Sequence, residues 1–400
     1  MTTEQRPAPD APLAPLHCLR LAEPGPPRLA ALPTGTPVWL VTRHADVRQV
    51  LTDPRIGRAT LYAPDAPPIT TTPNLLDDPD SLLNSDGADH QRIRRTVQRA
   101  FTPRAIARWR PWVASVVDGL LDGLEEGGSP ADVIAAFSRP LPVAVICRLM
   151  DLEGMDLDRL AHWSDHALSA SAYPAEEIAT AMREFGAFGH QLVLARRKDP
   201  GEDLVSSLVQ AADQDGSITE EQLTSLVIGL VVAGHETTMT SLGNALVYLL
   251  AEDREAWRRI GTDEESAAAA TEQLLRSVPL GDATEFPGLL RRAVQEVEIG
   301  GVVIPAGAVV AADTRTANRD PEVYPDGSTD LFAPIGTPSM TFGAGPHHCL
   351  GAWLARMELE LGLHRLAQRL PGLRLADPVE AIDWRRGLLT RSPQSLTVVW

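Results

Sequence analysis

Cysteine is scarce in this chain, which has three among 400 residues. Cys18, Cys147 and Cys349 cannot all pair, and their spacing does not resemble a disulfide framework. The motifs C-x-x-C and C-x-x-C-H are absent, which excludes zinc ribbons and covalently attached c-type haem. The sequence therefore predicts a protein of a reducing, bacterial-type cytoplasm.

Long hydrophobic runs and an excess of positive charge are also missing. No apolar stretch reaches the length of about 18 residues that a membrane span needs. The N-terminus, MTTEQRPAPDAPLAPL, lacks the apolar segment of a signal peptide. The formal net charge of −17 disfavours binding to nucleic acid and to anionic membranes. Neither kind of partner is expected.

The residues that are present predict one mainly α-helical domain with a smaller β portion. Residues 1–35 are rich in Pro and Ala and are expected to form an extended lead-in, and 36–400 a single catalytic domain. Ser217 and Glu220 fit a capping box that begins a helix of roughly 30 residues, apolar nearly all round. After Pro279, β-branched residues and Gly-containing turns predict a hairpin, and the C-terminus predicts another strand pair.

The segment FGAGPHHCLG holds one cysteine in unusual backbone. Gly343, Gly345 and Gly351 allow positive φ or close backbone approach. Apolar residues at 350, 354, 357 and 361 predict a helix that begins at this point, so Cys349 lies at its N-terminal end. The helix dipole and free N–H groups there favour a thiolate, which can serve as a nucleophile or a metal ligand. An inert buried cysteine is the alternative.

A second polar interruption, AGHETT, lies in the middle of the long helix. A buried Glu236 is costly unless it is paired or functional. The Thr237 hydroxyl can bond the carbonyl one turn back and loosen the helix, which would open a groove for a small ligand. A helix–helix contact through small residues is the alternative.

A third segment, DGADHQRIRRTVQRAFTP, places His90 and Arg94 four residues apart on one helix face. Two such donors suit a ligand with two carboxylates. A solvated basic face is the alternative.

Together these segments resemble the cytochrome P450 family. Phe342, Gly345, Cys349 and Gly351 match its haem-binding pattern F-x-x-G-x-x-x-C-x-G. The resemblance implies a long central helix over a buried haem b, with Cys349 as the axial metal ligand. It implies catalytic roles in proton delivery for Glu236 and Thr237. The other residues that it places at the cofactor are His90, Arg94, Ala233, Gly234, Arg291, Phe342, Gly345, His347 and Gly351. Arg292, adjacent to Arg291, leaves the register open.

One family element is altered. Where the family carries Glu-x-x-Arg, this chain has Gln273 and Arg276, and Ser328 and Thr329 stand where a basic partner is expected. An unpaired buried arginine is expensive. We therefore expect Glu272, four residues before Arg276, or a backbone carbonyl to satisfy the guanidinium.

The resemblance implies a monooxygenase that hydroxylates or epoxidises an apolar small molecule of secondary metabolism with O2. Electrons would come from a ferredoxin or flavodoxin with its reductase, because the chain has no redox module of its own. The arginines expected near the docking face are Arg94, Arg95, Arg99, Arg104 and Arg356. The segments expected to wall the substrate pocket are 57–84, 165–190, Leu280–Ala283 and Leu388–Leu389. The alternatives are a haem-binding scaffold, an oxidative coupling enzyme and a peroxide-dependent enzyme.

Overall fold

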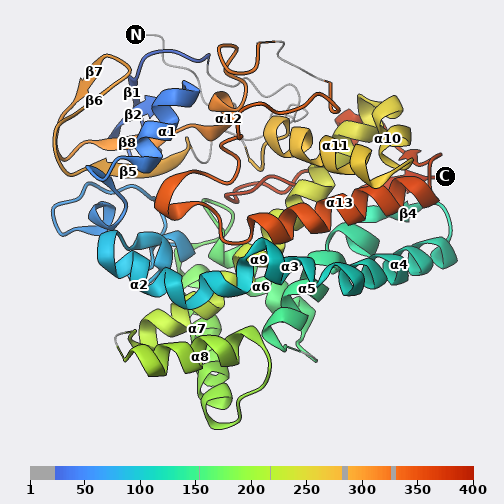
Figure 1. The fold of residues 1–400 in the computed structure, drawn as a ribbon, viewed down its shortest axis with the longest axis horizontal. Coiled ribbons are helices and arrows are strands. Elements are labelled where there is room, and N and C mark those ends of the chain that lie inside the picture. The colour runs from blue at the N-terminus through green and yellow to red at the C-terminus, as the bar shows by residue number, and fades with distance from the viewer. Residues whose placement is uncertain (1–22, 153, 217, 282–286, 326–329) are drawn as a thin grey trace.

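The computed structural model describes residues 23–152, 154–216, 218–281, 287–325 and 330–400 (Figure 1). The architecture is mainly α-helical with a smaller β portion, as the sequence predicts. The α-helices of the described residues are α1 His44–Thr52, α2 Gly87–Gln98, α3 Pro103–Ala107, α4 Arg110–Gly127, α5 Pro140–Met150, α6 Leu157–Ala167, α7 Ala175–Lys198, α8 Leu204–Asp215, α9 Glu220–Ala251, α10 Arg254–Ile260, α11 Glu264–Ser277, α12 Thr314–Ala317 and α13 Ala352–Arg369. The strands are β1 Arg28–Ala31, β2 Pro37–Val41, β3 Ile56–Gly57, β4 Ala131–Asp132, β5 Leu289–Ala293, β6 Val297–Ile299, β7 Val302–Ile304, β8 Val309–Ala312, β9 Arg374–Leu375 and β10 Thr397–Val399.

The largest sheet has the order β1-β2-β8-β5-β3 and joins three early strands to two strands that come much later in the chain. It lies beside α1 at the upper left of Figure 1, and the helices α7 and α8 lie at the bottom of that view. Strand β1 lies within the predicted lead-in and pairs antiparallel with β2. Residues 1–22, which include Cys18, lie outside the described residues. The sheet places β3 directly beside β5, and this pairing brings Arg58, which follows β3, close to Arg291 of β5.

Helix α9 is the long central helix that the sequence predicts, with 32 residues. Most of its side chains are buried, and it packs against α5, α7 and α13. Its capping box is formed by Thr219 and Gln222. The predicted cap Ser217 lies outside the described residues, and Glu220 is the first helical residue rather than the third, so the expected pairing was wrong by two positions.

The two predicted strand pairs differ in outcome. Strands β6 and β7 form the expected hairpin. The C-terminal pair was wrong in large part, because β10 pairs with β4 and β9, and the preceding residues share only an isolated bridge between Trp384 and Pro393. The reason is that the Gly387 carbonyl accepts N–H groups of residues 170–172 instead of completing a ladder across the turn.

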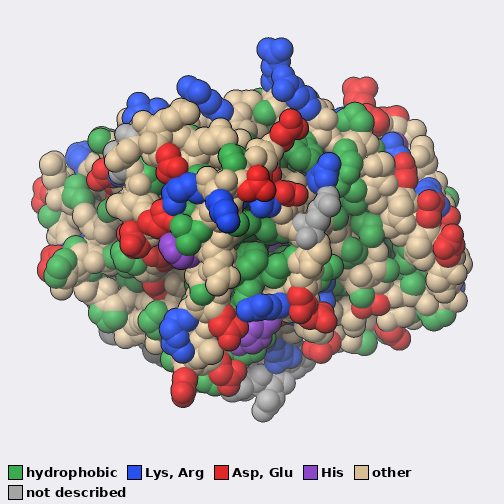
Figure 2. Space-filling view, turned by 90° about the horizontal axis from the view of Figure 1, so that it is seen from below, with side chains coloured by type: hydrophobic (Ala, Val, Ile, Leu, Met, Phe, Trp, Pro, Cys, Tyr) green, Lys and Arg blue, Asp and Glu red, His purple; other side chains and the backbone are tan. Residues whose placement is uncertain are grey.

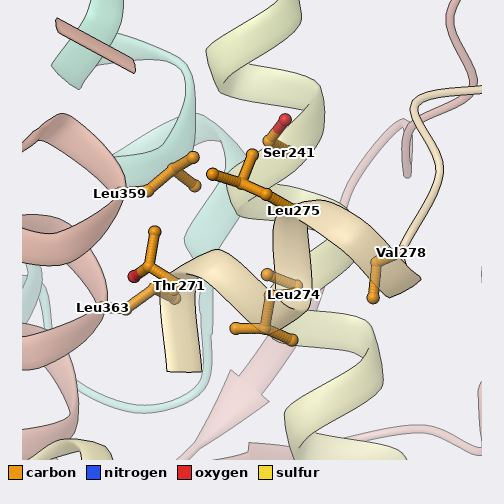
Figure 3. A pocket seen from close by; sticks show the side chains of 8 residues that line it. Ser241, Thr271, Leu274, Leu275, Val278, Leu359 and Leu363 are labelled. Carbon is orange, nitrogen blue, oxygen red and sulfur yellow. The ribbon is translucent and has the colours of Figure 1, made fainter. Parts of the chain in front are cut away.

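A small crevice lies among α9, α11 and α13 (Figure 3). Leu274 and Leu275 of α11 and Leu359 and Leu363 of α13 line it, with Thr271 between them. It is a gap in helix packing and holds no charged side chain.

The surface mixes both signs of charge. On the face that carries α7 and α8, seen from below in Figure 2, basic and acidic side chains are interspersed and hydrophobic ones gather near the middle. None of the helices that the structure describes combines the length and the apolar character needed to cross a membrane.

Candidate functional site

The loop before α13 holds Cys349 in a fixed position. The Cys349 N–H donates to the Phe342 carbonyl at 2.9 Å. Gly345 has φ +70°, and a Cβ at this residue would lie 2.5 Å from the Leu51 carbonyl oxygen, so only glycine fits. Gly351 is the N-cap of α13, two residues after the cysteine. The loop therefore presents the thiol at the start of a helix, as predicted.

Opposing effects act on the ionisation of Cys349. Its side chain has exposed surface, yet protein surrounds it closely enough that burial raises the pKa of the thiol. The N–H groups of Gly351 and Ala352 and the charges of Arg94 and Arg356 lower this pKa and favour the thiolate, as the sequence predicts, but burial outweighs them in the haem-free chain. A cation bonded to sulfur supplies the positive charge that this balance lacks.

Two histidines meet beside this loop. The rings of His90 on α2 and His347 lie 4.2 Å apart. His347 Nε2 contacts the Asp86 carboxylate at 3.2 Å. His90 Nε2 is buried and has no hydrogen-bond partner among the described residues. Burial and the neighbouring His347 lower the pKa of His90 to about 4. A buried, unpartnered ring nitrogen is a group that an anionic ligand can satisfy.

Two buried arginines extend the same cluster. Arg291 on β5 is 3% exposed and donates to the Leu290 carbonyl at 2.8 Å, with no ion pair to any described residue. Burial lowers its pKa to about 9. Arg58, directly after β3, is also 3% exposed and donates to Asn84 at 2.7 Å. Arg292 forms an ion pair with Asp65 at 2.8 Å, so of the two adjacent arginines Arg291 is the one without a carboxylate partner among the described residues.

Sequence reasoning missed Arg58 and Asp86. Both lie in or at the edge of an irregular segment, and nothing in the local pattern marks them. The Asp86 carboxylate accepts the backbone N–H groups of Arg58 and Ala59 at 2.6 and 2.7 Å, which anchors the segment to the start of α2.

Arg94 occupies the position that the sequence assigned to it on α2. Its guanidinium donates to the His348 carbonyl at 2.6 Å, and its charge acts on the Cys349 thiol. The spacing of His90 and Arg94 thus brings both side chains to the cysteine loop.

The predicted hydrogen bond in the middle of α9 is present, but the helix is continuous through this segment and is not loosened. Thr237 Oγ1 donates to the Ala233 carbonyl at 3.0 Å, one turn back. Ala233 is exposed and Thr237 partly exposed, although the helix is buried on most sides. A Cβ at Gly234 would lie 2.7 Å from Ile146, so this glycine permits close packing of α9 on α5.

Glu236 is buried and belongs to an ion-pair cluster that the sequence did not predict. Its carboxylate accepts from Arg385 at 2.5 Å and from the Thr390 hydroxyl at 3.4 Å. Arg385 also forms an ion pair with Asp165 of α6. The expected cost of the buried Glu236 charge is thus offset by pairing.

In the altered Glu-x-x-Arg element, Gln273 and a backbone carbonyl bind the guanidinium of Arg276. Arg276 donates to Gln273 Oε1 and to the Asn318 carbonyl, both at 2.8 Å. The expected backbone carbonyl is confirmed. The expected Glu272 was wrong, because Glu272 pairs with Arg356 of α13 instead. Gln273 also donates to the Ala333 carbonyl at 2.7 Å, a contact that a glutamate cannot make. Ser328 and Thr329 lie outside the described residues.

These residues fit a haem. One cysteine stands at a helix terminus, and His90, His347, Arg58 and Arg291 gather beside it with Asp86 as the carboxylate in contact. Such a donor set suits a metal with a soft ligand and a group that carries carboxylates. The mainly α fold and this site together define a haem-thiolate enzyme.

Comparison with known proteins gives the family. A family model described as Cytochrome P450 matches residues 187–394. Nocardicin C N-oxygenase of Nocardia uniformis subsp. tsuyamanensis is 42% identical over 369 residues, 92% of this chain and 91% of that protein. Mycinamicin IV hydroxylase/epoxidase of Micromonospora griseorubida is 44% identical over 370 residues, with the same coverage of 92% and 91%. The crystal structure of HinD with NMFT and NO has a TM-score of 0.87 at 38% identity, covering 94% of this chain and 93% of that chain.

The chain belongs to the cytochrome P450 family. It is a P450 monooxygenase whose cofactor is haem b, and it uses O2 together with electrons from a redox partner.

Proposed function

We propose that this enzyme inserts oxygen into a neutral, largely apolar small molecule of secondary metabolism, by hydroxylation or epoxidation. The observation that carries the proposal is the gathering of Cys349 with the buried donors His90, His347 and Arg291 in one site. The names of two relatives, an N-oxygenase and a hydroxylase/epoxidase, support the reaction type.

We assign the cofactor contacts as follows. Cys349 would ligate the iron, and Phe342, Gly345 and Gly351 would shape its loop. His90, Arg94, Arg291 and His347, joined by Arg58, would bind the carboxylates of the cofactor. Ala233 and Gly234 of α9 would lie against the cofactor. When bound, haem b supplies the one-electron chemistry that activates O2.

Proton delivery falls to two residues of α9. Glu236 holds a carboxylate in a buried site, where general acid–base groups are most effective. The Thr237 hydroxyl is fixed by its bond to Ala233, so its oxygen is presented in one orientation. Each oxygenation with O2 takes up two electrons and two protons and releases one water, and these residues pass the protons inward.

The substrate class follows from a second pocket, which we call the loop pocket. Its wall comes from three of the four predicted segments, with Ile69–Thr72 and Asn74, with Ala170 and Ser171, and with Leu389, and β-sheet residues such as Leu290 complete it. No charged side chain lines it. Of the fourth segment, Leu280–Ala283, residues 282 and 283 lie outside the described residues. Threonine and serine hydroxyls on an apolar wall suit a neutral substrate with oxygen acceptors.

We further propose a ferredoxin or flavodoxin with its reductase as the electron donor, and the cytoplasm as the compartment. Arg95, Arg99 and Arg104 are exposed on or just after α2, close in sequence to Arg94, whose charge acts on Cys349. An acidic carrier suits this group. Free thiols at Cys147 and Cys349 support a reducing compartment.

The test is an absorption spectrum of the purified protein, expressed with a haem precursor, then reduced and exposed to carbon monoxide. We expect a strongly red-shifted Soret band, which reports thiolate ligation. Cys349→Ala should abolish that band, and Cys147→Ala, which changes the half-buried cysteine of α5, should keep it. Absence of any haem absorbance in the wild-type protein would contradict the proposal and support a scaffold role.

A further inference from the structure

The turn at residues 387–389 joins the loop pocket to the α6–α7 connection. The Gly387 carbonyl accepts N–H groups of Ala170, Ser171 and Ala172 at 2.8, 2.8 and 3.0 Å. The Leu389 N–H donates to the Leu168 carbonyl at 2.9 Å. Gly387 has φ +70°, and a Cβ there would lie 2.7 Å from the Ala172 nitrogen. The turn and the α6–α7 connection therefore form one hydrogen-bonded unit, and Ala170, Ser171 and Leu389 all line the pocket.

The same turn is anchored to Glu236 on both sides. Arg385 precedes it and Thr390 follows it, and both donate to Glu236 Oε1. Arg385 and Glu236 side chains are 6% and 4% exposed, so their charge–charge contact is shielded from water. Arg385 also pairs with Asp165, whose side chain is 30% exposed on α6.

One guanidinium thus faces two carboxylates from different helices. Burial raises the pKa of Asp165, and the nearby Glu236 raises it further, whereas Arg385 and Arg139 lower it. Arg385 contacts the carboxylates of Glu236 and Asp165 at the same time. The position of its guanidinium therefore decides which hydrogen bonds Glu236 accepts.

We propose that Arg385 is a positioning residue: it orients the Glu236 carboxylate for proton delivery and ties that orientation to the loop-pocket wall through the turn at 387–389. A substrate that contacts Leu389 touches the segment that carries Arg385 and Thr390, and one that contacts Ser171 acts on this segment through the hydrogen bond from Ser171 to the Gly387 carbonyl. The inference rests on the proposed function, since it assigns Glu236 the proton-delivery role.

The activity test compares two ways of driving one reaction. With O2 and reductant, each product requires two protons from the protein, whereas hydrogen peroxide brings its own protons and electrons and yields product and water. The probe is dealkylation of 7-ethoxycoumarin, driven either by NADPH through a plant-type ferredoxin and its reductase or by peroxide. Arg385→Gln should lower the oxygen-driven rate roughly tenfold or more and leave the peroxide-driven rate nearly unchanged. Arg386→Gln, at the exposed neighbouring residue, is the matched control and should change neither.

A double-mutant cycle identifies the route of the effect. In the Glu236→Gln background, Arg385→Gln should lower the oxygen-driven rate no further, because it acts through Glu236. Equal loss of both rates, or full additivity, would show a contact that only stabilises the fold, and the proposal would be overturned.

Two readouts do not depend on turnover. In urea unfolding of the haem-free chain, the double variant should lose less than the sum of the single variants, because each single change strands a buried charge. Hydrogen exchange at the Ala170–Ala172 and Leu389 amides should rise in Arg385→Gln and not in Arg386→Gln. Additive midpoints with unchanged exchange would overturn the proposal. A wild-type protein without the carbon monoxide band would instead overturn the proposed function, and these two measurements still decide the Arg385 contact.

Discussion

The buried hydroxyl of Thr271 is expected to lower the stability of the fold. Its side chain is 1% exposed, and Oγ1 has no hydrogen-bond partner among the described residues (Figure 3). Thr271→Val removes the unsatisfied hydroxyl and should raise the free energy of unfolding by about 1 kcal/mol. Urea unfolding measures this change. Thr271→Ser keeps the hydroxyl and should give no gain, and a lower midpoint for the valine variant would contradict the prediction.

His90 makes the haem-free protein sensitive to acid. Its pKa is about 4 in the folded chain against 6.5 for the free residue, so between these values the unfolded chain binds a proton that the folded chain does not. Stability should therefore fall as the pH drops from 6.5 toward 4. Urea unfolding at pH 7 and pH 5 should show a smaller loss for His90→Asn than for the wild type. The exposed His190→Asn should behave as wild type, and equal losses in all three would refute the assignment.

Glu358 has the opposite dependence. It is fully buried on α13, neither oxygen has a hydrogen-bond partner in the described part of the chain, and burial raises its pKa well above 4.5. The folded chain keeps a proton that the unfolded chain loses, so stability falls as the pH rises above 4.5. Glu358→Gln should flatten this decline between pH 5 and pH 8. Glu360→Gln, on the same helix and paired with Arg110, should retain the wild-type slope.

At the scale of elements, a comparison of two glycines in the cysteine loop distinguishes the cost of backbone strain from the cost of a steric clash. Gly343 and Gly345 have φ +69° and +70°, but a Cβ at Gly343 meets nothing closer than 3.9 Å, whereas at Gly345 it meets the Leu51 carbonyl at 2.5 Å. Gly343→Ala should cost about 1–2 kcal/mol of stability. Gly345→Ala should cost more and also lower haem content, measured as the ratio of Soret to protein absorbance. Equal effects in both variants would show that strain alone decides.

Local sequence patterns predicted helices and contacts within a helix better than contacts between residues far apart in the sequence. The apolar stripe after Cys349 predicts α13, and the threonine at 237 finds the carbonyl four residues before it, because both depend on helix periodicity alone. Glu236 and Arg385 are far apart in the sequence, and only the completed fold brings them together. Glu272 is a second example. Its spacing on α11 favours a contact with Arg276, but in the folded chain it forms an ion pair with Arg356 of α13.

At the scale of the whole molecule, the charge is unevenly distributed, and an acidic protein carries a local group of exposed arginines. The chain carries −17 overall, yet three exposed arginines lie close together in the sequence: Arg95 on α2, Arg99 just after it and Arg104 on α3. Reduction by a plant-type ferredoxin should slow as salt rises, because screening weakens attraction between an acidic carrier and this group.

Replacing all three arginines by glutamine should lower the second-order rate of reduction about tenfold at low salt and remove most of its salt dependence. Stopped-flow absorbance measures both effects. Arg48→Gln, exposed on α1, is the control and should change neither. A rate that does not depend on these arginines would place the docking face elsewhere.

The pairing of β3 with β5 has a consequence for how the enzyme is made. Arg58 follows one strand and Arg291 lies on the other, and Cys349 comes later still, so the residues that we propose as cofactor contacts are spread from an early to a late part of the chain. Domains fold largely as units during synthesis, from the N-terminus onward. A nascent chain on the ribosome can therefore hold no haem until nearly all of it has emerged, and cofactor capture is the closing event of biosynthesis rather than a seed for it.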